Sequence, residues 1–317
     1  MRLCRFTHQN KTQAGLYDET SIVPLAAAAK AYADATKESV ALPDGDDLLA
    51  LLPHGSHAAA AKKIAAWASA NKSQLAAASI PVASVTLHVP VPRPNKLFLL
   101  AGNYAEHIRE GGGVAAERAE TFPYVFMKPP STTLTDPGAM VKIPKVSPGA
   151  IDWELELAVV IGKRCKHVKE ADALGVVAGY TVINDISDRK FKPNPERKPR
   201  DRDKFFDWLH GKWHDSFCAC GPCIISADAL PDPQTMPMTL KLNGQIKQDA
   251  NTGLMIFPVA AVIEFISSFV TLEPGDIIST GTPSGVGSTT GTFVKPGDKL
   301  EAAIDKIGVL VSPIGVE

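Results

Sequence analysis

The sequence lacks the features that mark several specialised classes of protein. Its 33 lysine and arginine residues nearly balance its 34 aspartate and glutamate residues, so the net charge is −1. Proteins that bind nucleic acid or anionic membranes usually carry a basic excess, so neither is expected as a main partner. No apolar run approaches the roughly 18 residues that span a bilayer, and the first residues lack the apolar core of a signal peptide. We therefore expect a cytoplasmic protein.

Cysteine is also scarce. The chain has 5 cysteines in 317 residues, an odd number without secretory features, so a disulfide framework is not expected. Cys218, Cys220 and Cys223 lie close together with His214 nearby, and a structural zinc site is one interpretation. Alternation along a strand instead puts Cys218 and Cys220 on one face and Cys223 beyond a Gly-Pro turn. This pattern favours small buried thiols.

A proline-rich stretch at residues 88–95 divides the chain, because its three prolines suit neither a helix interior nor a central strand. We place a small N-terminal α/β domain at residues 1–93 and a larger domain at 94–317. The larger domain has many short segments of strand character separated by proline and glycine, which predicts a β-rich α+β fold. Strands are expected at 2–8, 14–24, 96–102, 123–128, 140–144, 151–161, 176–184, 216–225, 238–247, 277–280 and 299–305, and helices at 25–37, 57–70, 103–110, 169–174 and 257–269.

One predicted strand carries a row of acids. Asp152, Glu154 and Glu156 alternate with apolar residues, so on a strand their side chains point to one face. Adjacent carboxylates repel each other unless a cation lies between them, and hard ions such as Mg²⁺ or Mn²⁺ prefer oxygen ligands. A solvated face of an antiparallel strand is the alternative. Asp185 ends another apolar strand and also needs a partner, which a metal shared with Glu154 and Glu156 would supply.

Several motifs occur in a fixed order along residues 94–317. They read Asn103-Tyr104-x-x-His107-x-x-Glu110, Asp152-Trp153-Glu154-x-Glu156-Leu157, Gly179-Tyr-Thr-Val-x-Asn184-Asp185-x-Ser187-x-Arg189, Gly211-Lys212-x-x-Asp215-Ser-Phe217 with Gly221-Pro222, and Gly281-Thr282-Pro283-Ser284-Gly285-Val286-Gly287. Together, this set resembles the fumarylacetoacetate hydrolase family. The N-terminal 90 or so residues resemble, more weakly, the small variable domain of its bacterial members.

The resemblance implies a catalytic domain of the mixed β-sandwich roll type, usually a homodimer, with one Mg²⁺ or Mn²⁺ per subunit. Carried over by position, the metal ligands are Glu154, Glu156 and Asp185, and Asp152 is a supporting acid. His107 and Glu110 resemble the family's general-base pair, in which the glutamate orients the histidine that activates water. A surface ion pair is the simpler interpretation of these two residues taken alone.

Further residues receive roles through the same resemblance. Lys212 is expected to stabilise a developing oxyanion, whereas without the resemblance it would be interpreted as a surface lysine. Expected contacts to a small-molecule 2-keto acid come from Tyr104, Arg189, Lys192, Gly281 and Thr282.

The implied reaction is metal-assisted cleavage of a carbon–carbon bond in a 2,4-diketo acid of the acylpyruvate, fumarylpyruvate or fumarylacetoacetate type. Water activated by His107 attacks the distal carbonyl, and the metal stabilises the departing enolate. The same fold also supports decarboxylation of oxaloacetate, isomerisation of hydroxymuconate-type acids and dehydration of sugar acids. A non-catalytic metal-binding or ligand-binding scaffold is a more distant alternative.

The segment after Arg189 departs from the family pattern. The family usually has an acid and an amide where this chain has Lys190 and Lys192, which favours a more anionic substrate such as a dicarboxylate. Residues 190–207 are rich in proline and in charges of both signs. A solvated loop is the simplest interpretation, and a lid over the site is the alternative.

Overall fold

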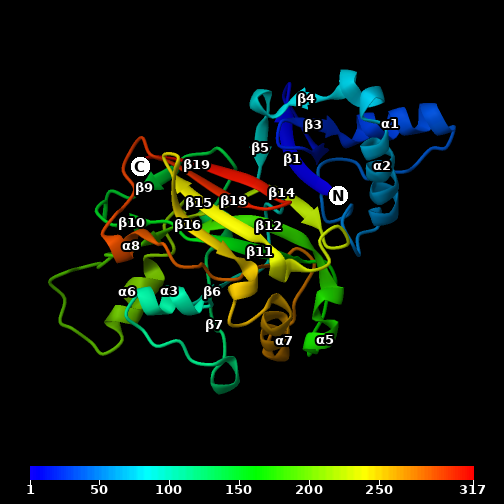
Figure 1. Cartoon of the computed structure of the whole chain (residues 1–317). Helices are drawn as coiled ribbons and strands as arrows, with labels where there is room; N and C mark the ends of the chain where they lie inside the picture. The colour runs from blue at the N-terminus through cyan, green and yellow to red at the C-terminus, as the bar shows by residue number, and fades with distance from the viewer.

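The computed structural model describes residues 1–317 and shows three β-sheets with helices at both ends. The largest sheet has 12 strands, and its main path runs β4-β3-β2-β1-β14-β12-β11-β17-β6-β7 (Figure 1). These strands are β1 (Arg2–His8), β2 (Lys11–Tyr17), β3 (Ser21–Pro24), β4 (Ile80–Pro81), β6 (Leu97–Ala101), β7 (Tyr124–Met127), β11 (Leu155–Ile161), β12 (Val177–Asp185), β14 (Cys218–Ser226) and β17 (Ile277–Ser279), with β5 (Thr86–His88) beside β1 and β8 (Leu134–Thr135) beside β14.

A second sheet packs on one face of the large sheet. Its five strands run in the order β16-β15-β18-β19-β9 and contact β11, β12 and β14. They are β9 (Val141–Ile143), β15 (Pro237–Leu242), β16 (Gln245–Asn251), β18 (Lys299–Ile304) and β19 (Gly308–Val316). A third, two-stranded sheet joins β10 (Ile151–Asp152) to β13 (Ser187–Asp188). The β-rich α+β prediction is therefore confirmed.

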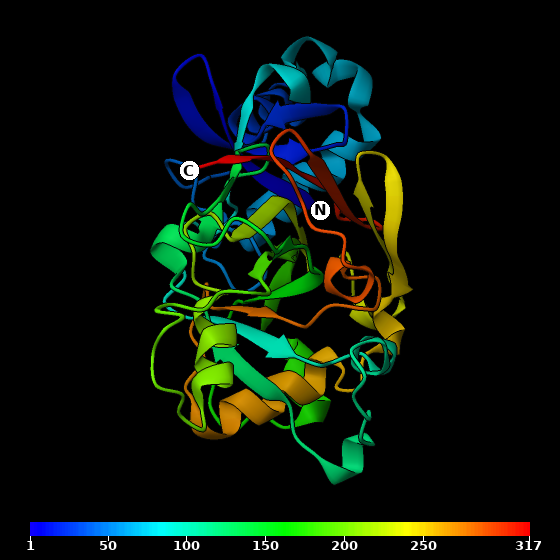
Figure 2. The ribbon, with the colours of Figure 1, turned by 90° about the vertical axis from the view of Figure 1, so that its left-hand side faces the viewer.

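Helices cover the two ends of this assembly. Figures 1 and 2 show α1 and α2 at one end and α5 and α7 at the opposite end. No helix is both long enough and apolar enough to cross a membrane. The helices are α1 (Leu25–Thr36), α2 (Ala58–Ala70), α3 (Ala105–Glu110), α4 (Pro130–Thr133), α5 (Glu170–Ala173), α6 (Asp203–His210), α7 (Val259–Phe269) and α8 (Gly287–Thr290).

Strand β11 is buried on both faces. Leu155, Leu157 and Val159 belong to the core shared with the second sheet, whereas Ala158 and Val160 belong to a separate core that includes residues of α1 and α2. The solvated acidic face considered from the sequence is therefore wrong for Glu156, which has 0% exposure. A fully buried carboxylate is costly unless it is paired or bound to a cation.

The strand predicted at residues 151–161 is broken after Asp152. The backbone N–H of Glu154 donates to Oδ1 of Asn184 at 3.0 Å, and that of Leu155 donates to Oε1 of Gln248 at 3.0 Å. Side chains therefore replace strand partners at the break, so Asp152 pairs in the small sheet instead of continuing β11.

The strand predicted at 238–247 is also interrupted, because Asn243 and Gly244 have positive φ and turn the chain into a hairpin.

Several elements were not predicted from the sequence, and the two longest of them are α6 and β19. Helix α6 begins inside the charged segment 190–207, which was interpreted as a loop, and extends beyond it to His210. Strand β19 lies between β18 and β9 in the second sheet. The N-terminal strands do not form a separate sheet, because β1 pairs with β14, opposing Arg2 to Ile225 and Leu3 to Ile224.

Candidate metal and catalytic site

Three carboxylates converge where β11 begins and β12 ends. Glu154 and Glu156 flank the start of β11, and Asp185 is the last residue of the antiparallel neighbour β12. Each can place one carboxylate oxygen within 4.8 Å of the other two, and all three residues are buried. The structure thus brings together the three acids expected from the sequence, and Asp152 lies outside this group.

Three cationic side chains surround these acids. Nζ of Lys212 lies 2.8 Å from Oε2 of Glu154 and 2.7 Å from Oδ2 of Asp185. Nη2 of Arg189 lies 2.6 Å from Oε1 of Glu154. Lys128 forms an ion pair with Oδ1 of Asp185, and its Nζ also donates to the carbonyl oxygen of Ile186 at 2.9 Å.

The pKa values follow from these partners. Burial acts to raise the pKa of Glu154, but Lys212 and Arg189 outweigh it and hold that pKa well below the usual range. Burial also acts to lower the pKa of Lys212, and Asp185 and Glu154 outweigh it, so the ammonium stays charged. For Glu156, burial and then the charges of Asp185 and Glu154 raise the pKa well above its ordinary value.

Glu156 provides a test of whether the acids suit a metal ion. Its Oε2 accepts hydrogen bonds from Oγ of Ser279 at 2.6 Å and from the N–H of Gly281 at 2.8 Å. Its Oε1 is buried and has no hydrogen-bond partner. An unpartnered carboxylate oxygen beside two further carboxylates is the donor set that Mg²⁺ or Mn²⁺ prefers, so these residues fit a hard divalent cation.

Asp152 supports the site from the small sheet. Its Oδ2 accepts a hydrogen bond from Nε of Arg189 at 2.8 Å, and its Oδ1 accepts one from the N–H of Gly287 at 2.7 Å. The carboxylate therefore fixes Arg189 and the start of α8. This geometry agrees with a structural role for Asp152.

The histidine–glutamate pair lies on the short helix α3. Nδ1 of His107 is 2.8 Å from Oε1 of Glu110, and Oε2 of Glu110 accepts the N–H of Gly285 at 2.9 Å. Glu110 therefore bridges α3 and the 281–287 loop. The ring of His107 lines the cleft that also contains Glu154 and Lys212.

This cleft is narrow, with a volume of about 60 Å³. Strand β6 and its following residues form one side of it, and Trp208 of α6 forms part of the wall. Trp208 was not identified from the sequence, and it directly follows residues 190–207, which were interpreted as a charged loop. The cleft residues are Leu100, Ala101, Gly102, His107, Glu154, Arg189, Trp208, Lys212 and Thr282.

The expected substrate contacts divide into two groups. Thr282 and Arg189 line the cleft, and Gly281 holds Glu156 through its N–H. Tyr104 is instead buried in the core, with its hydroxyl 3.5 Å from Sδ of Met238. Lys192 is exposed and does not line the cleft.

Lys190 also lies away from the cleft lining, with its Nζ 5.7 Å from the centroid of the Phe293 ring. The structure therefore does not bring the two lysines of the 190–192 segment to the cleft. The substitution pattern that favoured a dicarboxylate substrate gains no support from their placement.

Buried polar residues near the acids were also missed. Lys128, Asn184 and Gln248 are almost fully buried, and each contacts a metal-ligand candidate or the backbone next to one. A signal was available for Lys128, because it directly follows the apolar run Tyr124–Met127. A lysine that is buried at the end of such a run needs a functional or structural partner.

The cysteines follow the predicted alternation only in part, because β14 continues through Gly221 and Pro222 and the turn predicted before Cys223 is wrong. Cys218 and Cys220 pack in the same hydrophobic cluster, whereas Cys223 packs in the other cluster and its Sγ donates to the carbonyl oxygen of Ile307 at 3.2 Å. Burial raises the pKa of Cys218 to about 12, so its thiol is protonated at neutral pH.

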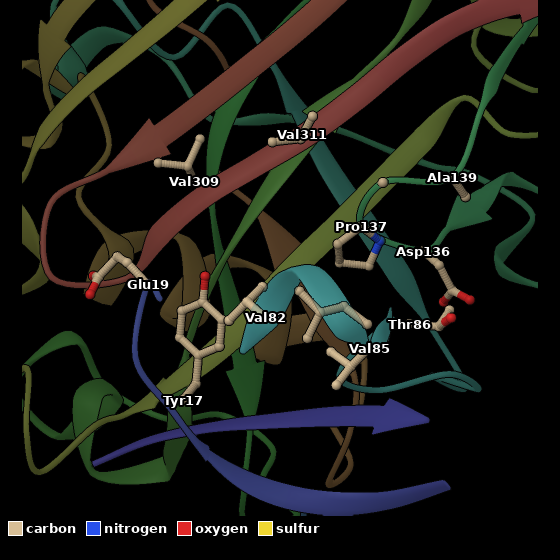
Figure 3. A pocket seen from close by; sticks show the side chains of 12 residues that line it. Tyr17, Glu19, Val82, Val85, Thr86, Asp136, Pro137, Ala139, Val309 and Val311 are labelled. Carbon is tan, nitrogen blue, oxygen red and sulfur yellow. The ribbon is translucent and has the colours of Figure 1, made fainter. Parts of the chain in front are cut away.

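A larger cavity of about 540 Å³ lies away from this site, between the N-terminal strands and β19 (Figure 3). Its walls are mainly apolar, with side chains such as Val82 and Val311. Its two carboxylates already have partners, since Glu19 pairs with Arg2 and Asp136 pairs with a histidine. The cavity contains none of the three acids of the cleft.

Comparisons with known proteins agree with this geometry. A family model described as fumarylacetoacetate (FAA) hydrolase C-terminal matches residues 96–315, and one described as Rv2993c-like, N-terminal matches residues 1–50. The chain is 37% identical over 237 residues to oxaloacetate tautomerase Fahd2a, mitochondrial, of Rattus norvegicus, which covers 74% of this chain and 71% of that protein. It is 42% identical over 225 residues to the uncharacterized protein PYRAB13970 of Pyrococcus abyssi, covering 71% and 92%.

Solved structures are similar over the whole chain. Maleylpyruvate hydrolase from Sphingobium sp. SYK-6, in complex with manganese(II) ion and pyruvate, has a TM-score of 0.69 at 29% identity and covers 100% of this chain and 99% of that one. The 5-carboxymethyl-2-hydroxymuconate delta-isomerase of Mycobacterium smegmatis has a TM-score of 0.69 at 26% identity, with the same coverage.

Proposed function

The chain belongs to the fumarylacetoacetate hydrolase family, and from this premise we propose that it is a divalent-metal-dependent hydrolase of a carbon–carbon bond in 2,4-diketo acids. The family resemblance predicted from the motifs is confirmed, as is the fold. One observation carries the proposal: the His107–Glu110 pair shares a narrow cleft with the buried carboxylate Glu154. A homodimer with one Mg²⁺ or Mn²⁺ per subunit stays a prediction.

Glu154, Glu156 and Asp185 would hold the cation. When bound, it would supply the positive charge that stabilises an enolate leaving group, since a carbanion is a poor leaving group without such stabilisation. The charge balance suits this role. With the cation bound and Glu156 ionised as its ligand, four carboxylates (Asp152, Glu154, Glu156, Asp185), three cations (Lys128, Arg189, Lys212) and the divalent ion would sum to +1. A net positive site favours an anionic 2-keto acid.

His107 is the general base in this proposal. Its Nδ1 faces the carboxylate of Glu110, so the carboxylate favours the tautomer with the proton on Nδ1 and leaves Nε2 to accept a proton from water. Glu110 is itself fixed by the N–H of Gly285. The helix, the base and the 281–287 loop are therefore held together before substrate enters.

Lys212 stabilises negative charge in the reacting substrate. Its side chain is 3% exposed, so a charge placed near its ammonium is poorly screened by water. Thr282 lines the same cleft, where its hydroxyl is held by Gln248 at 2.8 Å. These fixed groups orient the substrate relative to His107.

Keto–enol tautomerisation of oxaloacetate is the second candidate. The oxaloacetate tautomerases of several vertebrates are 36–38% identical to this chain. The same base fits this reaction, because His107 would move the proton between carbon and oxygen of the substrate instead of taking it from water. The narrow cleft also suits a compact substrate.

The two candidates are separated by assaying the Mn²⁺-loaded protein with acetylpyruvate, fumarylpyruvate and oxaloacetate. Release of pyruvate from an acylpyruvate supports hydrolysis, whereas faster ketonisation of enol oxaloacetate without release of pyruvate supports tautomerisation. His107→Ala should keep the Kd for Mn²⁺ and lose about 10²-fold or more in kcat. Glu154→Ala should lose metal binding. Full activity in either variant would overturn the assigned roles.

A further inference from the structure

Helix α6 places an indole ring at the cleft. The ring centroid of Trp208 lies 5.0 Å from that of Phe126, at an interplanar angle of 68°. Nζ of Lys212 lies 5.5 Å from the Phe126 centroid and 6.0 Å from the Trp208 centroid. The two aromatic rings therefore cover the side of Lys212 that is not paired with Glu154 and Asp185, and they keep water from it.

Ion pairs fix the helix that carries Trp208. Arg197 contacts Asp203 through Nε at 3.0 Å and Asp207 through Nη2 at 2.5 Å. Arg200 contacts the other oxygen of Asp203 at 3.0 Å. These arginines and aspartates of the 190–207 segment therefore pair with one another and stabilise the beginning of α6. Trp208 follows directly after this stabilised part of the helix.

The free space beside Trp208 is small. Its volume of about 60 Å³ is well below the roughly 300–1,000 Å³ of typical small-molecule pockets. The wall formed by Leu100 and Ala101 includes the end of β6, which is paired on both sides with β17 and β7, so that side cannot easily withdraw. A substrate group that extends past Lys212 would therefore meet the indole ring.

We propose that Trp208 sets the upper limit on substrate length, so that this site takes short 2-keto acids such as acetylpyruvate or oxaloacetate and rejects long acylpyruvates. The inference rests on the proposed 2-keto acid chemistry and narrows its substrate class. It assigns specificity to the indole of α6 in place of the lysines at 190 and 192, which do not line the cleft.

Binding and turnover are measured together with Mn²⁺-loaded protein. Calorimetry gives the Kd values of pyruvate and 2-oxooctanoate, and kinetics give kcat/KM for acetylpyruvate and hexanoylpyruvate. Trp208→Ala should shift both ratios toward the long compound by about 10-fold or more, because loss of the indole opens space for several methylenes. Trp208→Phe opens less space and should therefore shift both ratios less. Phe206→Ala is the matched control, since this residue lies on the same helix, is 42% exposed and does not line the cleft.

The outcomes separate this inference from the proposed function. Unchanged Kd ratios in a folded Trp208→Ala variant, or an equal shift in Phe206→Ala, would overturn the length limit. If Trp208→Ala does not fold, the ratio in Trp208→Phe decides in the same way. A shifted Kd ratio in a protein that turns over no 2-keto acid would support the length limit and overturn the proposed reaction.

Discussion

Nζ of Lys212 lies 2.8 Å from Oε2 of Glu154, with the two side chains 3% and 7% exposed. The same ammonium contacts Asp185 at 2.7 Å, so one buried cation neutralises parts of two metal-ligand candidates. Binding of a divalent ion therefore occurs in a site that already contains positive charge. Part of the carboxylate repulsion is relieved in the protein before any metal enters.

Replacing Lys212 should destabilise the metal-free protein. Lys212→Met leaves Glu154 and Asp185 buried with less compensation, and loss of one member of a buried ion pair costs about 3–5 kcal/mol. Urea unfolding in a chelating buffer measures this loss, and saturating Mn²⁺ should recover part of it. The exposed Lys241 provides the control variant Lys241→Met. Equal stability of the two variants without metal would contradict the prediction.

Lys128 should control metal affinity through Asp185. It is 1% exposed and pairs with Oδ1 of that ligand, so Lys128→Met removes the contact that orients the carboxylate. Loss of such a supporting partner typically weakens metal binding by about 10–100-fold. Titration calorimetry with Mn²⁺ measures the change, with the exposed Lys142→Met as control. An unaltered Kd in Lys128→Met would show that Asp185 is held by other contacts.

Metal affinity should rise with pH through Glu156. Burial and the charges of Asp185 and Glu154 raise the pKa of Glu156 well above 4.5, so its carboxyl keeps a proton over a range in which an ordinary glutamate is ionised. The carboxylate form binds the cation, so binding releases this proton and strengthens as pH increases through that range.

Calorimetry in buffers of different ionisation enthalpy counts the protons released when Mn²⁺ binds. Glu156→Gln should bind more weakly and should release fewer protons than the wild type. The assignment fails if affinity falls with increasing pH, or if the variant releases as many protons as the wild type.

Gly285 should be intolerant of a side chain. Its φ is +99°, and an added Cβ would lie 2.0 Å from the carbonyl oxygen of Lys247. Gly285→Ala should therefore destabilise the fold by about 2 kcal/mol or more and weaken the N–H contact that fixes Glu110. Gly291→Ala has a similar φ of +71° with no atom within 4 Å, so it should lose only about 1 kcal/mol. Thermal unfolding compares the two, and a larger loss in Gly291→Ala would contradict the steric argument.

Local spacing was enough to predict several parts of the site. The three-residue interval between His107 and Glu110 suits adjacent turns of a helix, and their 2.8 Å contact is found on α3. The acids at 154, 156 and 185 were grouped through the motif pattern, and the antiparallel pairing of β11 with β12 brings them together.

Other features depend on contacts between distant residues. The strand breaks before Leu155 because side-chain oxygens of Asn184 and Gln248 accept the backbone hydrogen bonds there. The alternation of apolar and acidic residues does not reveal these distant partners. Helix α6 was missed because its aspartates form ion pairs with Arg197, which precedes the helix, whereas such mixed charges in a sequence are typical of a solvated loop. The placement of Trp208 at the cleft was not predicted for the same reason.

The pairing of β1 with β14 ties the first residues of the chain to the strand next to β12. The N-terminal region therefore serves as a cover for a sheet edge that would otherwise be open. A fragment that began after residue 93 would keep the pairing of β8 with the start of β14 but would expose backbone donors and acceptors around Ile224 and Ile225, and such an edge can recruit other chains. The first strand is therefore expected to protect residues 94–317 from association with other chains.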